Sequence, residues 1–163
     1  MADSARVWLA FGSNLGDSRA LVGRAIAMIR ETPGVRLVAR SSDYRTPPWG
    51  KTDQPAFINA CIGIDTTLTP RALLARVHEI ERTLGRNRAT ETRWGPRTAD
   101  IDIVAWGNLT VSEPDLTLPH PRLFERAFVL KPLAEIAPDL VIAGRRVGEA
   151  AAKIDAAGIE KLA

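Results

Sequence analysis

Hydrophobic and polar positions alternate along several stretches of this chain, and the alternation predicts strands. Residues 7–11 (VWLAF) form a short apolar run, and residues 57–66 (FINACIGIDT) form a longer one. Residues 35–46 keep strand-like character as far as Thr46, where the proline-rich residues 47–55 can only form a loop. A further strand is expected at 99–106 (ADIDIVAW), where β-branched residues alternate with small or polar ones.

Two other stretches repeat their apolar residues at the spacing of a helix. The first helix is expected from residue 18 to about residue 31, with Asp17 or Ser18 as its N-terminal cap. The second helix begins after Thr69, carries Pro70 in its first turn and stops at Gly85. Toward the C-terminus we expect a hairpin through Gly107-Asn108, helical pieces near 122–136 and 147–155, and a packed or fraying terminal helix in the alanine-rich tail, 149–163.

This order of strand, helix, strand, strand, helix and strand predicts an α+β fold with a ferredoxin-like βαββαβ core. In such a core the helices pack on one face of a mainly antiparallel sheet, and additional C-terminal helices are expected to cover more of it. The 163 residues contain no internal repeat and no interdomain linker, so we expect a single domain, 1–163, that buries its core without disulfides or a structural metal.

Composition narrows the class of protein. Hydrophobic residues make up 45% of the chain and charged residues 25%. No apolar run approaches the length of a membrane span and no signal-like N-terminus is present, so we expect a soluble, cytoplasmic protein. The single cysteine, Cys61, lies in an apolar run without CxxC spacing and is expected to be a buried, inert thiol.

The strand at 99–106 carries two aspartates, Asp100 and Asp102, between isoleucines. Residues two apart on a strand share a face, so the carboxylates should lie together about 6–7 Å apart at their backbones, with Ile101 and Ile103 in a core on the other side. Paired hard oxygens suit Mg²⁺ or Mn²⁺, which bind through one or two carboxylates plus substrate phosphates. A solvated strand face is the alternative.

Arginine supplies 18 of the 22 basic residues, and five arginines fall within residues 82–97, which contain one acid, Glu91. Such a cluster needs an anionic partner or solvent, and either a nucleoside triphosphate or a nucleic-acid backbone would match guanidinium groups. Within the loop 85–98, Trp94 has no periodic apolar neighbours, which favours a stacking or lid role over an ordinary core position.

Three shorter patterns add candidate chemistry. His120, Arg122 and Arg126 in LPHPRLFERAFVL can bind a phosphate tail, although a capped surface helix with Glu125 as a local partner is the alternative. Phe57 and Asn59 share a strand face and suit a flat heterocycle with a patterned edge, or else form a core phenylalanine beside a strand-edge amide. GSNLG, residues 12–16, lacks the phosphate-loop patterns and is expected to be a tight turn.

Several longer motifs carry a family resemblance: AFGSNLGD, YRTPPWGKTDQPAFINA, GRNR, RWGPRTADIDIV and LPHPRLFERAFVLKPLAEIAP. With them the chain resembles, nearly end to end, the 6-hydroxymethyl-7,8-dihydropterin pyrophosphokinases of folate biosynthesis. The resemblance implies an ATP-dependent enzyme that transfers the β,γ-pyrophosphoryl group to the hydroxymethyl oxygen of the pterin and releases AMP, with two magnesium ions. It also implies small-molecule substrates, no nucleic-acid or membrane partner, and a monomer.

The resemblance further implies roles for individual residues. Asp100 and Asp102 would bind the metals, and Arg86 and Arg97 would stabilise the transition state. The implied ATP contacts are Glu81, Arg88, Arg93, Ile103, Thr117, His120, Arg122 and Arg126. The pterin would lie between Phe57 and Phe128, with its edge read by Asn59 and by the backbone near Thr46, Pro47 and Trp49, and with Trp94 closing over it. The chain departs from the family pattern at Ala89-Thr90, where many members carry a lysine, and at Phe124, where many have a second histidine.

Two other functions compete with this one. An RNA recognition module shares the expected strand order, but residues 57–64 offer only Phe57 where such modules present several aromatic residues. A nucleotidyltransferase would place a Gly-Ser turn about a dozen residues before its aspartate strand, whereas Gly12-Ser13 lies far upstream. The released product separates a pyrophosphokinase from a nucleotidyltransferase, because pyrophosphoryl transfer yields AMP and nucleotidyl transfer yields pyrophosphate.

Overall fold

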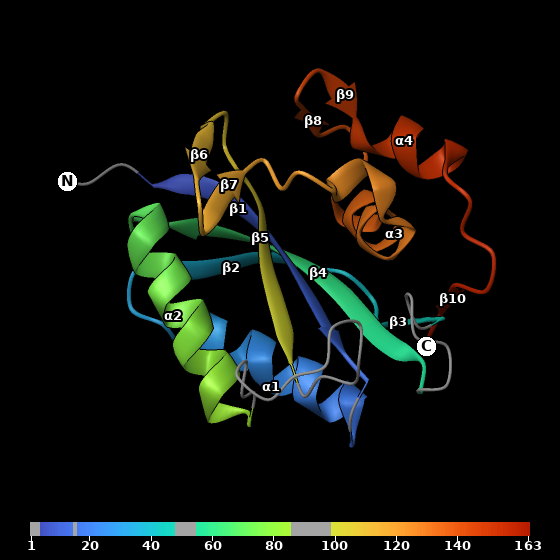
Figure 1. Ribbon diagram of the computed structural model, residues 1–163, viewed down its shortest axis with the longest axis horizontal. Coiled ribbons are helices and arrows are strands. Elements are labelled where there is room, and N and C mark those ends of the chain that lie inside the picture. The colour runs from blue at the N-terminus through green and yellow to red at the C-terminus, as the bar shows by residue number, and fades with distance from the viewer. Residues whose placement is uncertain (1–3, 15, 48–54, 86–98) are drawn as a thin grey trace.

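The structure is a computed structural model that describes residues 4–14, 16–47, 55–85 and 99–163. Its elements follow one another from the N-terminus to the C-terminus as labelled in Figure 1. They are β1 (Ala5–Ser13), α1 (Ser18–Arg30), β2 (Val35–Arg40), β3 (Tyr44–Thr46), β4 (Phe57–Thr66), α2 (Pro70–Thr83), β5 (Asp100–Trp106), β6 (Val111–Glu113), β7 (Leu116–Leu118), the 3-10 turn η1 (Leu123–Glu125), α3 (Ala127–Ile136), β8 (Val141–Ile142), β9 (Arg145–Arg146), α4 (Val147–Lys153) and β10 (Glu160–Lys161).

The main sheet has the strand order β10-β3-β4-β1-β5, and β2 also pairs with β4. Every pairing in it is antiparallel. Because β2 pairs with the second half of β4 and β3 with the first half, β2 and β3 together fill one strand position. The order then reads β2/β3, β4, β1, β5, with a helix after β1 and another after β4, which confirms the predicted ferredoxin-like core.

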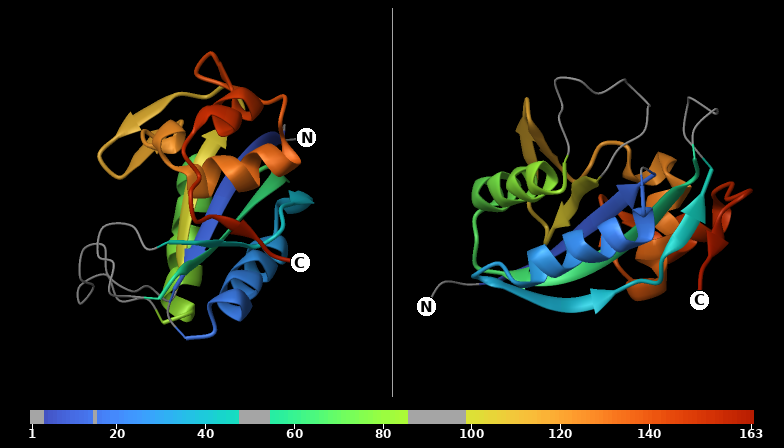
Figure 2. Two further views of the ribbon diagram at one scale, coloured as in Figure 1. Left: turned by 90° about the vertical axis from the view of Figure 1, so that its right-hand side faces the viewer. Right: turned by 90° about the horizontal axis from the view of Figure 1, so that it is seen from below.

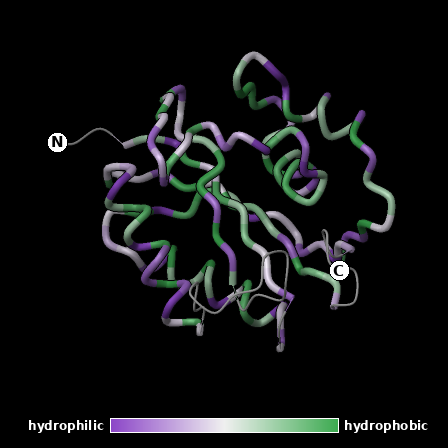
Figure 3. The backbone as a smooth tube through the Cα atoms, viewed as in Figure 1, coloured by the Kyte–Doolittle hydropathy of each residue, from purple (hydrophilic) through white to green (hydrophobic). Residues whose placement is uncertain are grey.

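Both faces of this sheet are covered, because its strands alternate between two apolar clusters. On β1, Val7, Leu9 and Phe11 pack with α1 and α2, whereas Trp8 and Ala10 pack with α3 and α4. The layers are visible in Figure 2, and Figure 3 shows hydrophobic and hydrophilic residues interleaved along α1 and α2, as expected for helices with one face on the core. The C-terminal helices therefore form the second cover that the sequence led us to expect.

The helix ends follow from local hydrogen bonds. The side chain of Asp17 accepts from the Ala20 amide and caps α1, and that of Thr69 accepts from the Ala72 amide and caps α2. Gly85 follows α2 with a φ of 97°, a left-handed conformation that stops the helix. These predictions are confirmed, and among the described residues every helix is too short or too polar to cross a bilayer.

Three local predictions were wrong. Gly12 and Ser13 are not in a turn but extend β1, because Gly12 is still paired with β4 and β5 and Ser13 is still paired with β4. A turn does form at Gly107-Asn108, closed by the bond from the Leu109 amide to the Trp106 carbonyl, but it does not lead into a hairpin, because β6 pairs with β7 and not with β5. The tail is not helical to its end, because α4 stops at Lys153 and Glu160–Lys161 pair with the edge strand β3.

Candidate active site

The candidate site begins with a row of three residues on neighbouring strands. Gly12 on β1 is the register partner of Asn59 on β4 and of Asp100 on β5. In the next row, Ala10 stands between Cys61 and Asp102. Register partners on adjacent strands point to the same face, and adjacent strands are about 4.8 Å apart, so the Cα atoms of Asn59 and Asp100 lie about 10 Å apart across Gly12.

That face is the one on which α3 packs, because Ala10 and Cys61 belong to the apolar cluster of α3 and α4. Cys61 is fully buried, as predicted, and burial, together with the nearby charge of Asp102, raises the pKa of its thiol. Ile101 and Ile103 point the other way, into the cluster of α1 and α2. The predicted division of β5 into an apolar and an acidic face is therefore confirmed.

The aspartate pair lies at an edge of the sheet and keeps part of its surface open. The side chain of Asp102 is 32% exposed, and its Oδ2 lies 3.6 Å from Nη1 of Arg126, which precedes α3. Among the described residues no cluster of three or more metal-binding side chains is present, so the pair would supply two carboxylates. Mg²⁺ is commonly held by one or two carboxylates, with water and phosphate oxygens completing its shell, and the donor set fits that ion.

A narrow pocket, which as it stands has no room for a water molecule, adjoins Asp102 and is also lined by Val104, His120, Leu123, Arg126 and Val129. The His120 amide donates to the carbonyl of Val104 at 2.8 Å, which fixes this residue to β5. Its Nδ1 accepts from the Arg122 amide at 3.1 Å, so the ring proton of the neutral form sits on Nε2. Burial lowers the pKa of His120 to about 4. The charges of Arg126 and Arg122 also lower this pKa, and the charge of Asp100 raises it. Near neutral pH the imidazole is thus an uncharged hydrogen-bond donor.

The other described residues that were predicted to contact ATP do not line this pocket. Arg122 is exposed just before η1, and Thr117 is exposed on β7. Glu81 is 1% exposed, and its Oε2 accepts from the Ile101 amide at 2.9 Å, so it supports β5 from α2. The side chain of Ile103 is in the core; its backbone faces the outer edge of β5, as the Ile101 amide two residues earlier does.

The residues predicted to hold a heterocycle include Phe57 and Asn59 on β4, which is separated from the aspartates on β5 by β1. Phe57 is half-buried two residues before Asn59, and Phe128 is half-buried near the start of α3. Asn59 is 7% exposed and lies on an inner strand, which contradicts the alternative of a strand-edge amide. Its Oδ1 accepts from Thr46 Oγ1 at 2.7 Å, and its Nδ2 donates to the Phe11 carbonyl at 3.3 Å. Pro47 follows β3 and is exposed.

The aromatic residue that departs from the family pattern, Phe124, is packed rather than open. It lies partly buried against the cluster of α3 and α4, and the guanidinium carbon of Arg145 lies 4.1 Å from the centre of its ring. The six remaining site predictions lie outside the described residues: Trp49, Arg86, Arg88, Arg93, Trp94 and Arg97.

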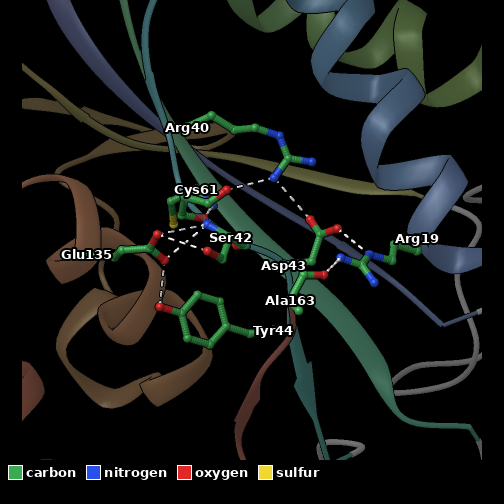
Figure 4. Close-up of polar contacts among 9 residues, drawn as sticks. Arg19, Arg40, Ser42, Asp43, Tyr44, Cys61, Glu135 and Ala163 are labelled. Atoms are coloured by element: carbon green, nitrogen blue, oxygen red, sulfur yellow. Dashed lines mark hydrogen bonds and ion pairs between the residues drawn. The ribbon is translucent and has the colours of Figure 1, made fainter.

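A brace at the far end of α3, which we call the Glu135 brace, joins this helix to β3. The Glu135 carboxylate accepts from the backbone amide and the hydroxyl of Ser42 and, at 2.7 Å, from the hydroxyl of Tyr44 (Figure 4). Beside it, the buried Asp43 binds Arg19 and Arg40. The brace was not predicted, and neither was the role of Gly12, although small residues at 10 and 12 in a strand of bulky ones were a visible signal.

Known proteins with similar sequences belong to one family. Residues 8–138 match the family described as 7,8-dihydro-6-hydroxymethylpterin-pyrophosphokinase (HPPK). A 2-amino-4-hydroxy-6-hydroxymethyldihydropteridine pyrophosphokinase of Methylorubrum extorquens is 56% identical over 96% of this chain and 98% of its own length. The protein of the same name from Pseudomonas aeruginosa is 43% identical over 96% of each chain.

Solved structures with a similar fold are also known. A Plasmodium falciparum HPPK-DHPS crystal structure with pterin and p-hydroxybenzoate is similar with a TM-score of 0.78 at 13% identity, covering 99% of this chain. Another from the same organism, with pteroate, has a TM-score of 0.72. This chain spans 47% and 42% of those two longer chains, respectively, and at such low identity the likeness concerns the fold alone.

Proposed function

The chain belongs to the 7,8-dihydro-6-hydroxymethylpterin-pyrophosphokinase family, and we propose that the α3-side face of its sheet is where it performs the reaction of that family. It transfers the β,γ-pyrophosphoryl group of ATP to the hydroxymethyl oxygen of 6-hydroxymethyl-7,8-dihydropterin in folate biosynthesis. The observation that carries this placement is the row of Asn59, Gly12 and Asp100, in which an amide and an acid lie on the same face of the sheet on either side of a residue with no side chain.

On the amide side, the pterin lies between the rings of Phe57 and Phe128, and Asn59 reads its edge. Both rings are half-buried, and the guanidinium carbon of Arg126 lies 5.6 Å from the centre of the Phe128 ring. The backbone at Thr46 and Pro47 completes the edge contacts. By family similarity Trp49 and Trp94 join them.

On the acid side, Asp100 and Asp102 would hold the two Mg²⁺ ions. When bound, the ions neutralise phosphate charge and lower the pKa of the attacking hydroxyl group. His120 donates through Nε2 and Arg126 through its guanidinium to the same phosphates, since both residues lie beside Asp102. Arg122 and Thr117 bind ATP at its exposed side, and Glu81 acts from beneath by holding β5.

The chemistry is positioning and charge neutralisation. The hydroxymethyl oxygen forms a bond to the β-phosphorus, the bond from the β-phosphorus to the oxygen of the α-phosphate breaks, and AMP leaves as the hydroxyl proton is released. Arg86 and Arg97 are the proposed stabilisers of the charge that develops, and Arg88 and Arg93 are further ATP contacts. The monomeric state and the cytoplasmic location expected from the sequence stay predictions.

The test is incubation of the protein with ATP, Mg²⁺ and 6-hydroxymethyl-7,8-dihydropterin, followed by mass analysis. AMP and a pterin diphosphate are expected, and chelation of Mg²⁺ with EDTA should abolish both. Release of inorganic pyrophosphate with a nucleotidylated pterin would overturn the assignment in favour of a nucleotidyltransferase. No pterin-dependent product at all would overturn it as well.

A further inference from the structure

The orientation of the Asn59 amide is fixed by groups of the protein itself. A backbone carbonyl can only accept a hydrogen bond, so the amide atom that faces the Phe11 carbonyl at 3.3 Å must be the donor, Nδ2. Oδ1 then faces Thr46, and at 2.7 Å the Thr46 hydroxyl must donate to it. An amide flipped by 180° would place two oxygens against each other at Phe11, so one orientation is selected.

The two restraints on this amide differ in strength. The bond from Thr46 is short, and both of its partners are buried, at 3% and 7% exposure. The bond to Phe11 is near the long limit for an N–H donor. The Thr46 hydroxyl is therefore the stronger restraint. After both bonds form, Asn59 retains one N–H and one lone pair of Oδ1 for a ligand.

Gly12 on β1, on the other side of β4 from Thr46, leaves room for the Asn59 amide. A Cβ atom at position 12 would lie 2.8 Å from Nδ2 of Asn59, and the next nearest atoms would be 3.9 Å away. The atom in conflict is the end of a side chain, so an added methyl group would move the Asn59 amide while leaving the backbone of β1 in place.

We propose that Thr46 is a positioning residue whose hydroxyl holds the Asn59 amide in the orientation that the Phe11 carbonyl selects, and so keeps its donor and acceptor in place for the pterin. This inference rests on the proposed function, and it differs from the backbone contact assigned to Thr46 there. The hydroxyl acts through Asn59, because its proton is committed to Oδ1. An amide free to rotate would present the wrong pattern to the heterocycle for part of the time.

The matched variants are Thr46→Val, which keeps the shape and removes the hydroxyl, and Thr46→Ser, which keeps the hydroxyl. Thr46→Val is expected to raise the KM for the pterin about three- to tenfold, the loss of one hydrogen bond, with the KM for ATP unchanged. Thr46→Ser should stay within about twofold of wild type. Gly12→Ala should also raise the KM for the pterin selectively. Urea unfolding of each variant shows how much of it is folded.

A double-mutant cycle decides whether Thr46 acts through the amide. In the background of Asn59→Ala, Thr46→Val should cause no further loss in pterin binding, measured by titration of the pterin alone. A further loss equal to that in the wild-type background would overturn the inference, as would a loss with Thr46→Ser as large as with Thr46→Val. If the wild-type protein releases AMP with the pterin while Thr46→Val binds it normally, this inference fails and the proposed function stands.

Discussion

The Glu135 brace can be tested by removing a single oxygen atom with Tyr44→Phe. Tyr44 is 7% exposed, and its hydroxyl donates to Glu135 Oε1 at 2.7 Å. The ring that packs in the core stays the same, so the change deletes one hydrogen bond. It also weakens the link between β3, which carries Thr46, and α3, which carries Phe128 two turns before Glu135 on the same side of the helix.

The magnitude follows from the charge of the acceptor. A hydrogen bond to a charged group contributes about 1.5–3 kcal/mol, roughly twice the value for two neutral partners. Glu135 keeps its bonds from the amide and hydroxyl of Ser42, so the carboxylate is not left unpaired. We expect the free energy of unfolding to fall by about 1.5–3 kcal/mol at neutral pH. For a domain of this size that is a drop in Tm of roughly 3–12 °C.

Acid should reduce this difference. Burial acts to raise the pKa of Glu135, but the hydrogen bonds from Tyr44 and Ser42 outweigh it and lower the pKa below its ordinary value. A carboxylate whose pKa is lower in the folded state stabilises the protein above its unfolded pKa, and this stabilisation is lost as the pH falls through the folded pKa. Below that pH the bond to Tyr44 joins two neutral groups, and the difference should shrink to about 0.5–1.5 kcal/mol.

The assay is urea unfolding of wild type and Tyr44→Phe at neutral pH and again below about pH 4. Glu135→Gln is the control background, because it cannot titrate, and in it the effect of Tyr44→Phe should not depend on pH. A loss smaller than about 0.5 kcal/mol at neutral pH would refute the reasoning. So would a difference that grows on acidification.

Four further outcomes are expected. Asp102→Asn should lower kcat about 100-fold or more at saturating Mg²⁺, measured as AMP release, and near-normal turnover would contradict its role in metal binding. Phe57→Ala should weaken pterin binding about tenfold and leave ATP binding unchanged in separate titrations; equal losses would place the pocket elsewhere. Gly63→Ala should cost about 1–3 kcal/mol in urea unfolding, because its Cβ would stand 2.5 Å from Cζ3 of Trp8. Ala143→Asn should raise the free energy of unfolding by about 0.5 kcal/mol, because Ala143 has a φ of 51° in the two-residue turn between β8 and β9 and asparagine tolerates this left-handed conformation better than alanine. An unchanged Tm would count against this.

Much of the fold could be predicted because its signals are local. The alternation of Asp100 and Asp102 with Ile101 and Ile103 is a property of one strand, and it holds for any partner that buries the isoleucines. The caps of α1 and α2 depend on bonds that span three residues. Such features are fixed within a few residues of the chain, so they can be recognised without knowing what packs against them.

The parts that were missed depend on residues distant in sequence. Tyr44 and Glu135 are 91 positions apart, and no pattern within β3 or α3 shows that they meet. Gly12 looked like part of a turn because glycine, serine and asparagine follow one another there. Its real constraint is a neighbour on β4, since only a residue without a Cβ leaves room for the Asn59 amide. The tail Glu160–Lys161 became a strand because β3 offered it an open edge.

One face of the sheet is core at one end and the proposed binding surface at the other, and the residues along β1 become smaller from the first end to the second. Trp8 fills the space under α3 and α4, Ala10 fills less of it, and Gly12 fills none. The flanking strands change in the same direction, from the buried Cys61 and Val104 to the polar Asn59 and Asp100. Packing at one end thus holds the strands together, while the missing side chain at the other end leaves room for the Asn59 amide beside Gly12. A substitution that enlarges residue 12 should therefore impair ligand binding before it impairs folding.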